Sequence, residues 1–227
     1  MLVGDQAQLP PFVQEGANNV DLLNKHGLRE DDLKKTLLDF FISKLPVECI
    51  LPLDTQYRMC PEIGNLVSNT FYDGKLKTGR GDAVPFSKNL AITKPVTWYS
   101  TSKSDERFET RDGKSYINRL EANYISSVIK RFNLAAKALN KTFTVCVLSF
   151  YSSQQNVLCS EVARIESDCE NLDITCDTVD SFQGREADIC IVSITRCNTQ
   201  GKLGFVDDPN RVNVAISRGK EIGRAHV

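Results

Sequence analysis

Apolar residues along this chain follow two alternating patterns. Residues 118–139 carry apolar side chains at helical spacing, namely Leu120, Tyr124, Val128, Phe132 and Ala135. This spacing is typical of a helix with one buried face. Residues 143–149, FTVCVLS, are apolar at almost every position, which is typical of a parallel strand buried on both faces.

The same patterns predict elements along the rest of the chain. Helices are expected over residues 31–45, 61–74, 152–167 and 210–219. Strands are expected over residues 48–53, 95–101, 174–181 and 187–196. Loops are expected over residues 14–28, 75–94 and 101–114. Strands that alternate with helices in this order predict a doubly wound α/β domain with a mostly parallel sheet.

Polar clusters follow two of the predicted strands. SFYSSQ begins at Ser149, and DSFQGRE begins at Asp180. Ligands of open α/β sheets bind beyond the carboxyl ends of the strands. We therefore expect both clusters at that end of the sheet.

Charge and hydropathy limit how the protein can bind nucleic acid and whether it can span a membrane. The 28 basic and 29 acidic residues give a net charge of -1, so nucleic acid could be bound only by a local groove and not by a global positive field. No stretch approaches the ~18 apolar residues of a membrane span, and no signal peptide opens the chain. We expect a soluble protein of the cytoplasm or nucleus, with no membrane partner.

The eight cysteines are scattered and form no C-x-x-C pair. Several lie inside apolar runs, as Cys146 and Cys190 do. We interpret them as reduced, mostly buried thiols and predict no metal site.

Four short motifs occur in a fixed order. They are GDQAQLPP from Gly4, QYRMCPEI from Gln56, VDSFQGREAD from Val179 and RVNVAISRGK from Arg211. Together they resemble consecutive motifs of the superfamily 1 helicases, and most closely those of the subgroup that includes the RNA helicase of nonsense-mediated decay. The resemblance implies a RecA-like, doubly wound domain, the second motor domain of a P-loop helicase.

The resemblance also implies roles in ATP hydrolysis. Arg58 and Arg218 resemble the two arginine fingers of the family, a role suited to a planar guanidinium that pairs two phosphate oxygens. Gln8 resembles the residue that senses the γ-phosphate. Tyr57 matches a position beside the nucleotide.

Further family positions lie in the third motif and after residues 143–149. Gln183, Gly184 and Glu186 resemble residues that contact the nucleotide. Four others match positions that hold the backbone of the nucleic-acid strand: Ser149, Tyr151, Thr178 and Ser181. Plain turn and capping chemistry is an alternative interpretation of these four residues.

The sequence departs from the family in two respects. Cys60 stands where histidine is usual. Neither a G-x-x-x-x-G-K-[ST] phosphate loop nor the D-E-A-x-Q segment that binds Mg²⁺ occurs in the chain. In the family both precede the first motif, so we expect the Mg²⁺ ligands upstream of this chain.

These observations divide the chain into three parts. Residues 1–45 are interpreted as the remnant of a first RecA-like domain and residues 46–220 as the second. Residues 221–227, EIGRAHV, match one reading frame of a common sequencing adapter, so we expect a non-native tail. Residues 222–227 offer no apolar face or cap as a surface for docking, and we expect them to contribute nothing to stability.

The sequence as a whole predicts a fragment of an ATP-dependent helicase, 5′ to 3′ by resemblance. Its expected cofactors are ATP and Mg²⁺, and its expected partner is single-stranded nucleic acid, RNA rather than DNA. Two alternatives remain: a module that binds nucleotide or nucleic acid without hydrolysis, and a structural α/β domain.

Overall fold

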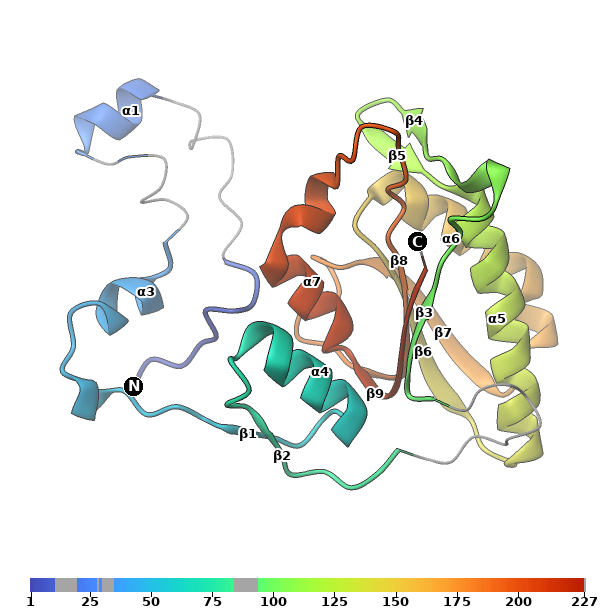
Figure 1. The fold of residues 1–227 in the computed structure, drawn as a ribbon, viewed down its shortest axis with the longest axis horizontal. Coiled ribbons are helices and arrows are strands. Elements are labelled where there is room, and N and C mark those ends of the chain that lie inside the picture. Colours follow the sequence, from blue (N-terminus) through green and yellow to red (C-terminus); the bar gives the residue numbers. More distant parts are fainter. Residues whose placement is uncertain (11–19, 28, 30–34, 84–93, 227) are drawn as a thin grey trace. The chain divides into compact units, whose positions relative to one another are not determined.

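The computed structural model describes residues 1–10, 20–27, 29, 35–83 and 94–226 (Figure 1). The chain forms two compact units, Met1–Leu53 and Asp54–Val227. The first unit contains helices α1 (Val20–Lys25) and α3 (Leu37–Ile42) and the 3₁₀ turn η2 (Val47–Cys49).

Two predictions for the first unit are wrong. Helix α1 lies within the predicted loop 14–28. No strand forms over the described residues 48–53, where a 3₁₀ turn and extended chain stand instead. Part of the helix predicted over 31–45 falls outside the described residues. Its described part, α3, begins at a capping box in which Thr36 and Asp39 exchange hydrogen bonds.

The second unit is built on a parallel five-stranded sheet in the order β3-β9-β8-β6-β7. Its strands are β3 (Val96–Tyr99), β6 (Phe143–Ser149), β7 (Leu172–Thr178), β8 (Ala187–Ser193) and β9 (Gly219–His226). Two small sheets pair β1 (Thr55–Gln56) with β2 (Lys77–Thr78) and β4 (Thr110–Asp112) with β5 (Ser115–Ile117). The predicted doubly wound, RecA-like α/β fold is thereby confirmed.

Helices cover both faces of the sheet (Figure 1). Helices α5 (Arg119–Ala138) and α6 (Ser152–Ile165) lie on one face. Helices α4 (Pro61–Phe71) and α7 (Pro209–Ile216) lie on the other. Short 3₁₀ turns complete the unit: η4 (Asp105–Arg107), η5 (Glu166–Asp168) and η6 (Gly204–Asp207).

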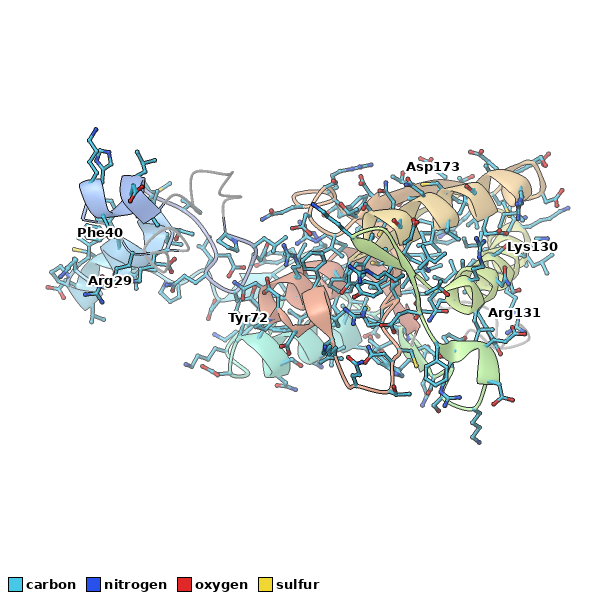
Figure 2. The ribbon with its side chains drawn as sticks, turned by 90° about the horizontal axis from the view of Figure 1, so that it is seen from above. Arg29, Phe40, Tyr72, Lys130, Arg131 and Asp173 are labelled. Carbon is cyan, nitrogen blue, oxygen red and sulfur yellow. The ribbon has the colours of Figure 1, made fainter. Side chains whose placement is uncertain are left out.

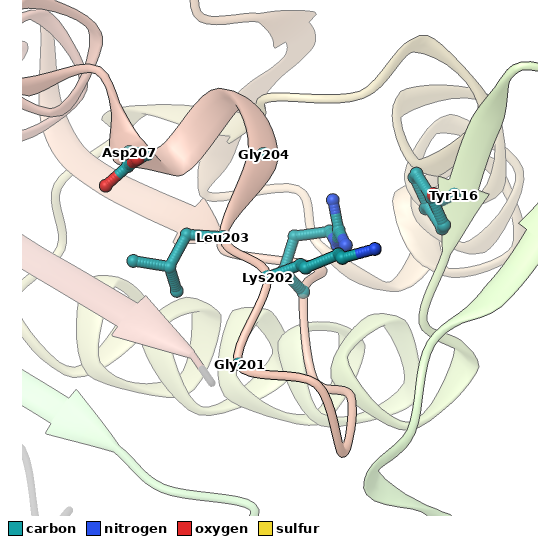
Figure 3. Close-up of a pocket in the computed structure, with 7 residues that line it drawn as sticks. Tyr116, Gly201, Lys202, Leu203, Gly204 and Asp207 are labelled. Carbon is teal, nitrogen blue, oxygen red and sulfur yellow. The ribbon is translucent and has the colours of Figure 1, made fainter.

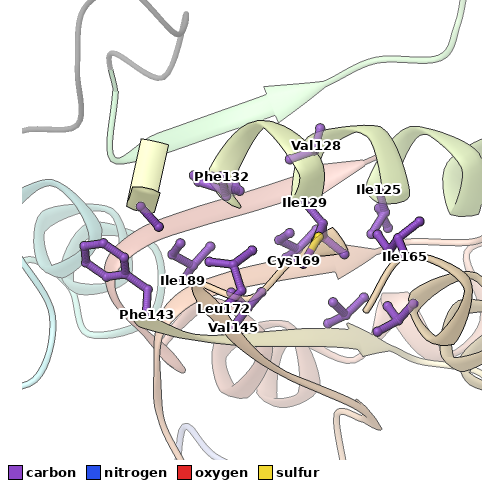
Figure 4. Close-up of a cluster of buried hydrophobic side chains, with 14 of the residues drawn as sticks. Ile125, Val128, Ile129, Phe132, Phe143, Val145, Ile165, Cys169, Leu172 and Ile189 are labelled. Atoms are coloured by element: carbon purple, nitrogen blue, oxygen red, sulfur yellow. The ribbon is translucent and has the colours of Figure 1, made fainter. Parts of the chain in front are cut away.

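The larger core lies between α5, α6 and the sheet (Figure 4). Ile129 and Phe132 of α5 are fully buried there, against Val145 and Ile189 of the central strands. The exposed residues of α5, such as Lys130 and Arg131, point outward (Figure 2). Of the residues that the helical spacing predicted to be buried, Val128, Phe132 and Ala135 are buried, whereas Leu120 is half-buried and Tyr124 is 50% exposed. The spacing thus identified the buried face only over the second half of α5.

The chain after α7 contradicts two predictions. The predicted helix 210–219 ends at Ile216, and Gly219–His226 forms strand β9 between β3 and β8. Ile222 is 2% exposed and packs in the core. The expectation that this tail offers no surface for docking is therefore wrong. The reason is that backbone hydrogen bonds to strands on both sides hold β9, and these do not depend on an apolar sequence.

Candidate functional site

Arg58 lies in a loop that a single glutamine side chain shapes. The Oε1 atom of Gln56 accepts hydrogen bonds from the backbone N–H groups of Arg58 and Met59, at 2.9 and 2.7 Å. Its Nε2 atom donates to the Met59 carbonyl at 3.0 Å. Gln56 thus fixes the turn between β1 and α4. The sequence reasoning missed this role, although Gln56 is the first residue of the QYRMCPEI motif.

The Arg58 side chain joins the motif that precedes β8. Its Nε atom donates to Glu186 Oε2 at 2.8 Å. Lys220 Nζ lies 3.5 Å from Glu186 Oε1 and 3.3 Å from Asp188 Oδ1. The hydrogen bond from Arg58 and the positive charges of Arg58 and Lys220 lower the pKa of Glu186. The fold therefore brings together Arg58 and Glu186, two residues predicted to lie near a nucleotide.

Arg218 lies beside Arg58 but is buried, with 1% of its surface exposed. It donates to the carbonyl oxygens of Val214 and Arg185, at 2.9 and 3.1 Å, and to Ser217 Oγ at 3.0 Å. Arg58 Nη1 donates to the carbonyl of the same Ser217 at 3.4 Å. Burial and then repulsion by Arg58 lower the pKa of Arg218. Two guanidinium groups from opposite ends of the unit thus converge on one residue.

Arg80, which the sequence reasoning also missed, ties the two arginine segments together. Its Nη1 atom donates to the backbone carbonyls of Arg58 and Lys220, at 2.6 and 3.0 Å. Its Nη2 atom pairs with the Glu221 carboxylate. No family pattern marked this residue, and only the packing of residues after β2 against β9 reveals it.

Tyr57 presents its ring to solvent, with 73% of the residue exposed. One side of the ring rests on Gly79, where an added Cβ would lie 2.3 Å from Tyr57 Cε1. The ring is therefore held in place while its other side remains available for stacking.

Gln183, Gly184 and Glu186 lie on the crossover from β7 to β8. Because the two strands are parallel, this segment leaves the carboxyl end of β7 and returns to the amino end of β8. The prediction that the whole DSFQGRE cluster lies at the carboxyl ends is therefore wrong for Glu186, which directly precedes β8. Gln183 and Gly184 are exposed, and Gly184 has a positive φ of 84°.

The four residues predicted to bind the backbone of the nucleic acid lie near the carboxyl ends of β6 and β7. Ser149 and Tyr151 are buried: Ser149 Oγ is 3.2 Å from Thr195 Oγ1, and the Tyr151 hydroxyl accepts from Arg196. Thr178 is half-buried and Ser181 is exposed, and Thr178 Oγ1 donates to Ser181 Oγ at 2.9 Å. Of these four residues, Thr178 and Ser181 are the two that present hydroxyl groups at the surface.

A buried carboxylate lies near the carboxyl end of β8. Glu121 of α5 is fully buried and accepts hydrogen bonds from Ser193 Oγ at 2.6 Å and from the Thr195 N–H at 3.0 Å. Asn118 Nδ2 also donates to it, at 3.2 Å. Burial raises the pKa of Glu121 to about 7. The sequence reasoning did not single out Glu121 and missed this network.

Gln8 belongs to the first unit. Its Nε2 atom donates to Asp5 Oδ2 at 2.9 Å, and its backbone N–H donates to the Asp5 carbonyl at 3.3 Å. These bonds hold residues 5–8 in a turn, which explains the orientation of Gln8 within its own motif.

Two features are absent from the described residues. No helix among them is long and apolar enough to cross a membrane. In the same part of the chain, no group of three or more His, Cys, Asp and Glu side chains is placed to hold a metal ion.

The chain is similar to one protein family and to several known proteins. The profile of a family described as an AAA domain (AAA_12) matches residues 33–222. The chain is 33% identical to human "Probable helicase senataxin", 32% to "Regulator of nonsense transcripts 1 homolog" of Drosophila melanogaster and 30% to "ATP-dependent helicase NAM7" of Saccharomyces cerevisiae. Each alignment covers 97% of this chain.

The chain spans only 8%, 18% and 22% of these three relatives. The matched region nevertheless includes three of the four motifs and all five strands of the main sheet, with β9 matched as far as Ile222. This chain belongs to the AAA domain family of the superfamily 1 helicases, in the branch that includes regulator of nonsense transcripts 1 and senataxin.

Proposed function

We propose that this chain is the C-terminal motor half of an ATP-dependent helicase and that Arg58 and Arg218 act on the γ-phosphate of ATP. The convergence of the two side chains on Ser217 carries the proposal. Charge spreads over the γ-phosphate oxygens during transfer, and fixed guanidinium groups stabilise it. The names of the relatives, which describe helicases, support the same assignment.

The residues around Arg58 fit an anionic ligand. Glu186 places a carboxylate between Arg58 and Lys220, at 2.8 and 3.5 Å. A phosphate could take over these contacts, and its negative charge would relieve the repulsion between Arg58 and Arg218. The exposed ring of Tyr57 is suited to stack on a base.

The remaining roles extend the same proposal. Arg218 reaches a phosphate only when its hydrogen bond to the Arg185 carbonyl opens, so we propose that Arg218 contacts the phosphate only after this bond has opened. Gln8 would sense the γ-phosphate. ATP would supply the phosphoryl group, and Mg²⁺ would be held by carboxylates of the phosphate-loop half.

We propose that the nucleic acid binds at the carboxyl ends of the sheet strands. Thr178 and Ser181 offer exposed hydroxyl groups there, which bind phosphates without reading sequence. We propose single-stranded RNA as the substrate, because one relative is named as a regulator of nonsense transcripts. The 5′ to 3′ movement is proposed from the resemblance of the motifs to their helicase subgroup.

The test uses an enzyme in which a phosphate-loop domain precedes this chain. Arg58→Ala and Arg218→Ala should each reduce ATP turnover by about 10³, and nucleotide affinity should fall much less. Arg58→Lys should not restore turnover, because an ammonium group cannot bridge two oxygens. The double variant should lose less than the product of the two single losses.

Arg164→Ala is the matched control, since Arg164 is exposed on α6 and pairs only with Glu161 among the described residues. Its turnover should stay normal. Near-normal turnover in Arg58→Ala would refute the finger assignment of Arg58. Intact nucleotide binding without any turnover in the unmodified enzyme would favour the binding-module alternative.

A further inference from the structure

A pocket of about 420 Å³ opens beside the loop that follows β8 (Figure 3). Tyr116 of β5 lines one side, and Arg196 and loop residues 201–204 line the other. The candidate ATP residues lie at the amino end of β8, and this pocket lies past its carboxyl end. Since β8 has seven residues, roughly 23 Å of strand separates the two places.

Arg196 forms a rigid wall of this pocket. Its side chain is 6% exposed, and so is that of Glu109, to whose Oε1 atom the Arg196 Nε donates at 3.0 Å. Nη1 donates to the Tyr151 hydroxyl at 3.1 Å, and the guanidinium lies 4.1 Å from the centre of the Tyr116 ring. Three neighbours thus fix the guanidinium, and little conformational entropy remains to be lost when a ligand binds.

Three hydrogen-bond donors of the pocket have no protein partner among the described residues. They are Nη2 of Arg196, Nζ of Lys202 and the hydroxyl of Tyr116. None of the three is a buried, unsatisfied atom, so solvent reaches each of them. Lys202 extends toward Tyr116, whereas Asp207 points away from it (Figure 3). Glu109 balances the charge of Arg196, so the positive charge added to this pocket is that of Lys202. Converging donors with such a charge are suited to bind an anion.

The surroundings identify the kind of anion. Leu203 and Phe205 are exposed beside the pocket, and exposed apolar rings and side chains next to a phosphate site are typical of single-strand binding. Tyr151, a predicted strand contact, bonds to Arg196 and also accepts from the Phe205 N–H at 3.1 Å. The pocket is therefore joined directly to the proposed nucleic-acid edge.

We infer that Arg196, Lys202 and Tyr116 bind one backbone phosphate of a single-stranded nucleic acid. The inference rests on the proposed function, since it places a contact on the strand that the helicase would hold. Arg196 and Lys202 would supply charged contacts to the nucleic acid at the carboxyl end of the sheet, which the buried Ser149 and Tyr151 do not supply.

The test measures binding of a fluorescently labelled 12-nucleotide oligouridylate to the 227-residue chain by anisotropy. One phosphate contact on a single strand contributes a salt exponent of about 0.7. Lys202→Ala should therefore weaken binding about eightfold at 50 mM salt and about threefold at 200 mM. Lys202→Arg should restore binding, and Tyr116→Phe should lower affinity by a smaller factor.

Lys141→Ala is the matched control. Lys141 is an exposed lysine just before β6, at the amino end of the sheet. If Lys202→Ala and Lys141→Ala bind alike while the unmodified chain binds, this inference is wrong and strand binding stands. If the unmodified chain does not bind the oligouridylate, both the proposed nucleic-acid binding and this inference are wrong. If inorganic phosphate binds the unmodified chain more tightly than Lys202→Ala, while the oligouridylate binds both proteins alike, the pocket binds a free anion and the contact to the nucleic acid is refuted.

Discussion

Glu121 provides the sharpest test of the structure, because its charge state depends on burial. Its carboxylate accepts from Ser193 Oγ and the Thr195 N–H, and the side chain has no solvent contact. Burial, opposed in part by these hydrogen bonds and assisted by the charge of Glu109, raises its pKa from 4.5 to about 7. Folding therefore favours the protonated form of Glu121.

The direction of the pH effect follows from this pKa. The folded state binds the proton more tightly than the unfolded state, so the contribution to stability is full below pH 4.5 and is lost as pH rises through 7. Each tenfold change in proton affinity corresponds to ~1.4 kcal/mol. The difference between 4.5 and about 7 then corresponds to about 3 kcal/mol of unfolding free energy.

The perturbation is Glu121→Gln, which keeps the shape of the side chain and removes its titration. Urea unfolding, followed by circular dichroism between pH 4.5 and 8, gives the unfolding free energy of each protein. The unmodified chain should lose about 3 kcal/mol relative to Glu121→Gln over this interval. Glu170→Gln, a control at an exposed position, keeps Glu121 and should lose the same ~3 kcal/mol as the unmodified chain. A constant difference between the unmodified chain and Glu121→Gln would refute the buried, raised-pKa carboxyl.

Three further substitutions are checked by the same urea unfolding at neutral pH. Gly204→Ala should lower stability by roughly 1–3 kcal/mol, because Gly204 has a φ of 61° and an added Cβ would lie 2.3 Å from the Tyr151 hydroxyl oxygen; an unchanged midpoint would contradict this packing. Ile222→Ala should cost about 2–5 kcal/mol because Ile222 is buried in the core, and no loss would restore the expectation of an undocked tail. Glu186→Gln should change stability by less than about 1 kcal/mol, since its pair with Arg58 is part-exposed; a larger loss would mean that the pair is structural.

The elements that the sequence predicted best are those whose side-chain pattern reflects burial directly. Strand β6 was predicted at its observed bounds, 143–149, and helix α5 within one residue at each end. Both lie at the centre of the core, where most inward positions are apolar and only a few buried polar residues, such as Glu121 and Ser149, interrupt the pattern. Three of the four motifs contain residues that meet in the second unit: Arg58, Glu186 and Arg218 lie close together although they are far apart in the sequence.

Tertiary structure alone decided three other features. Strand β9 is held by hydrogen bonds to β3 and β8, and Glu221 in its sequence gave no apolar signal. Arg80 and Glu121 became notable only through partners distant in the chain, such as Arg58 and Ser193. A single sequence reports the burial preference of each residue through its periodicity. It does not report which unpaired strand edge, backbone carbonyl or buried polar atom a residue will meet, because those partners are set by the packing of the whole unit.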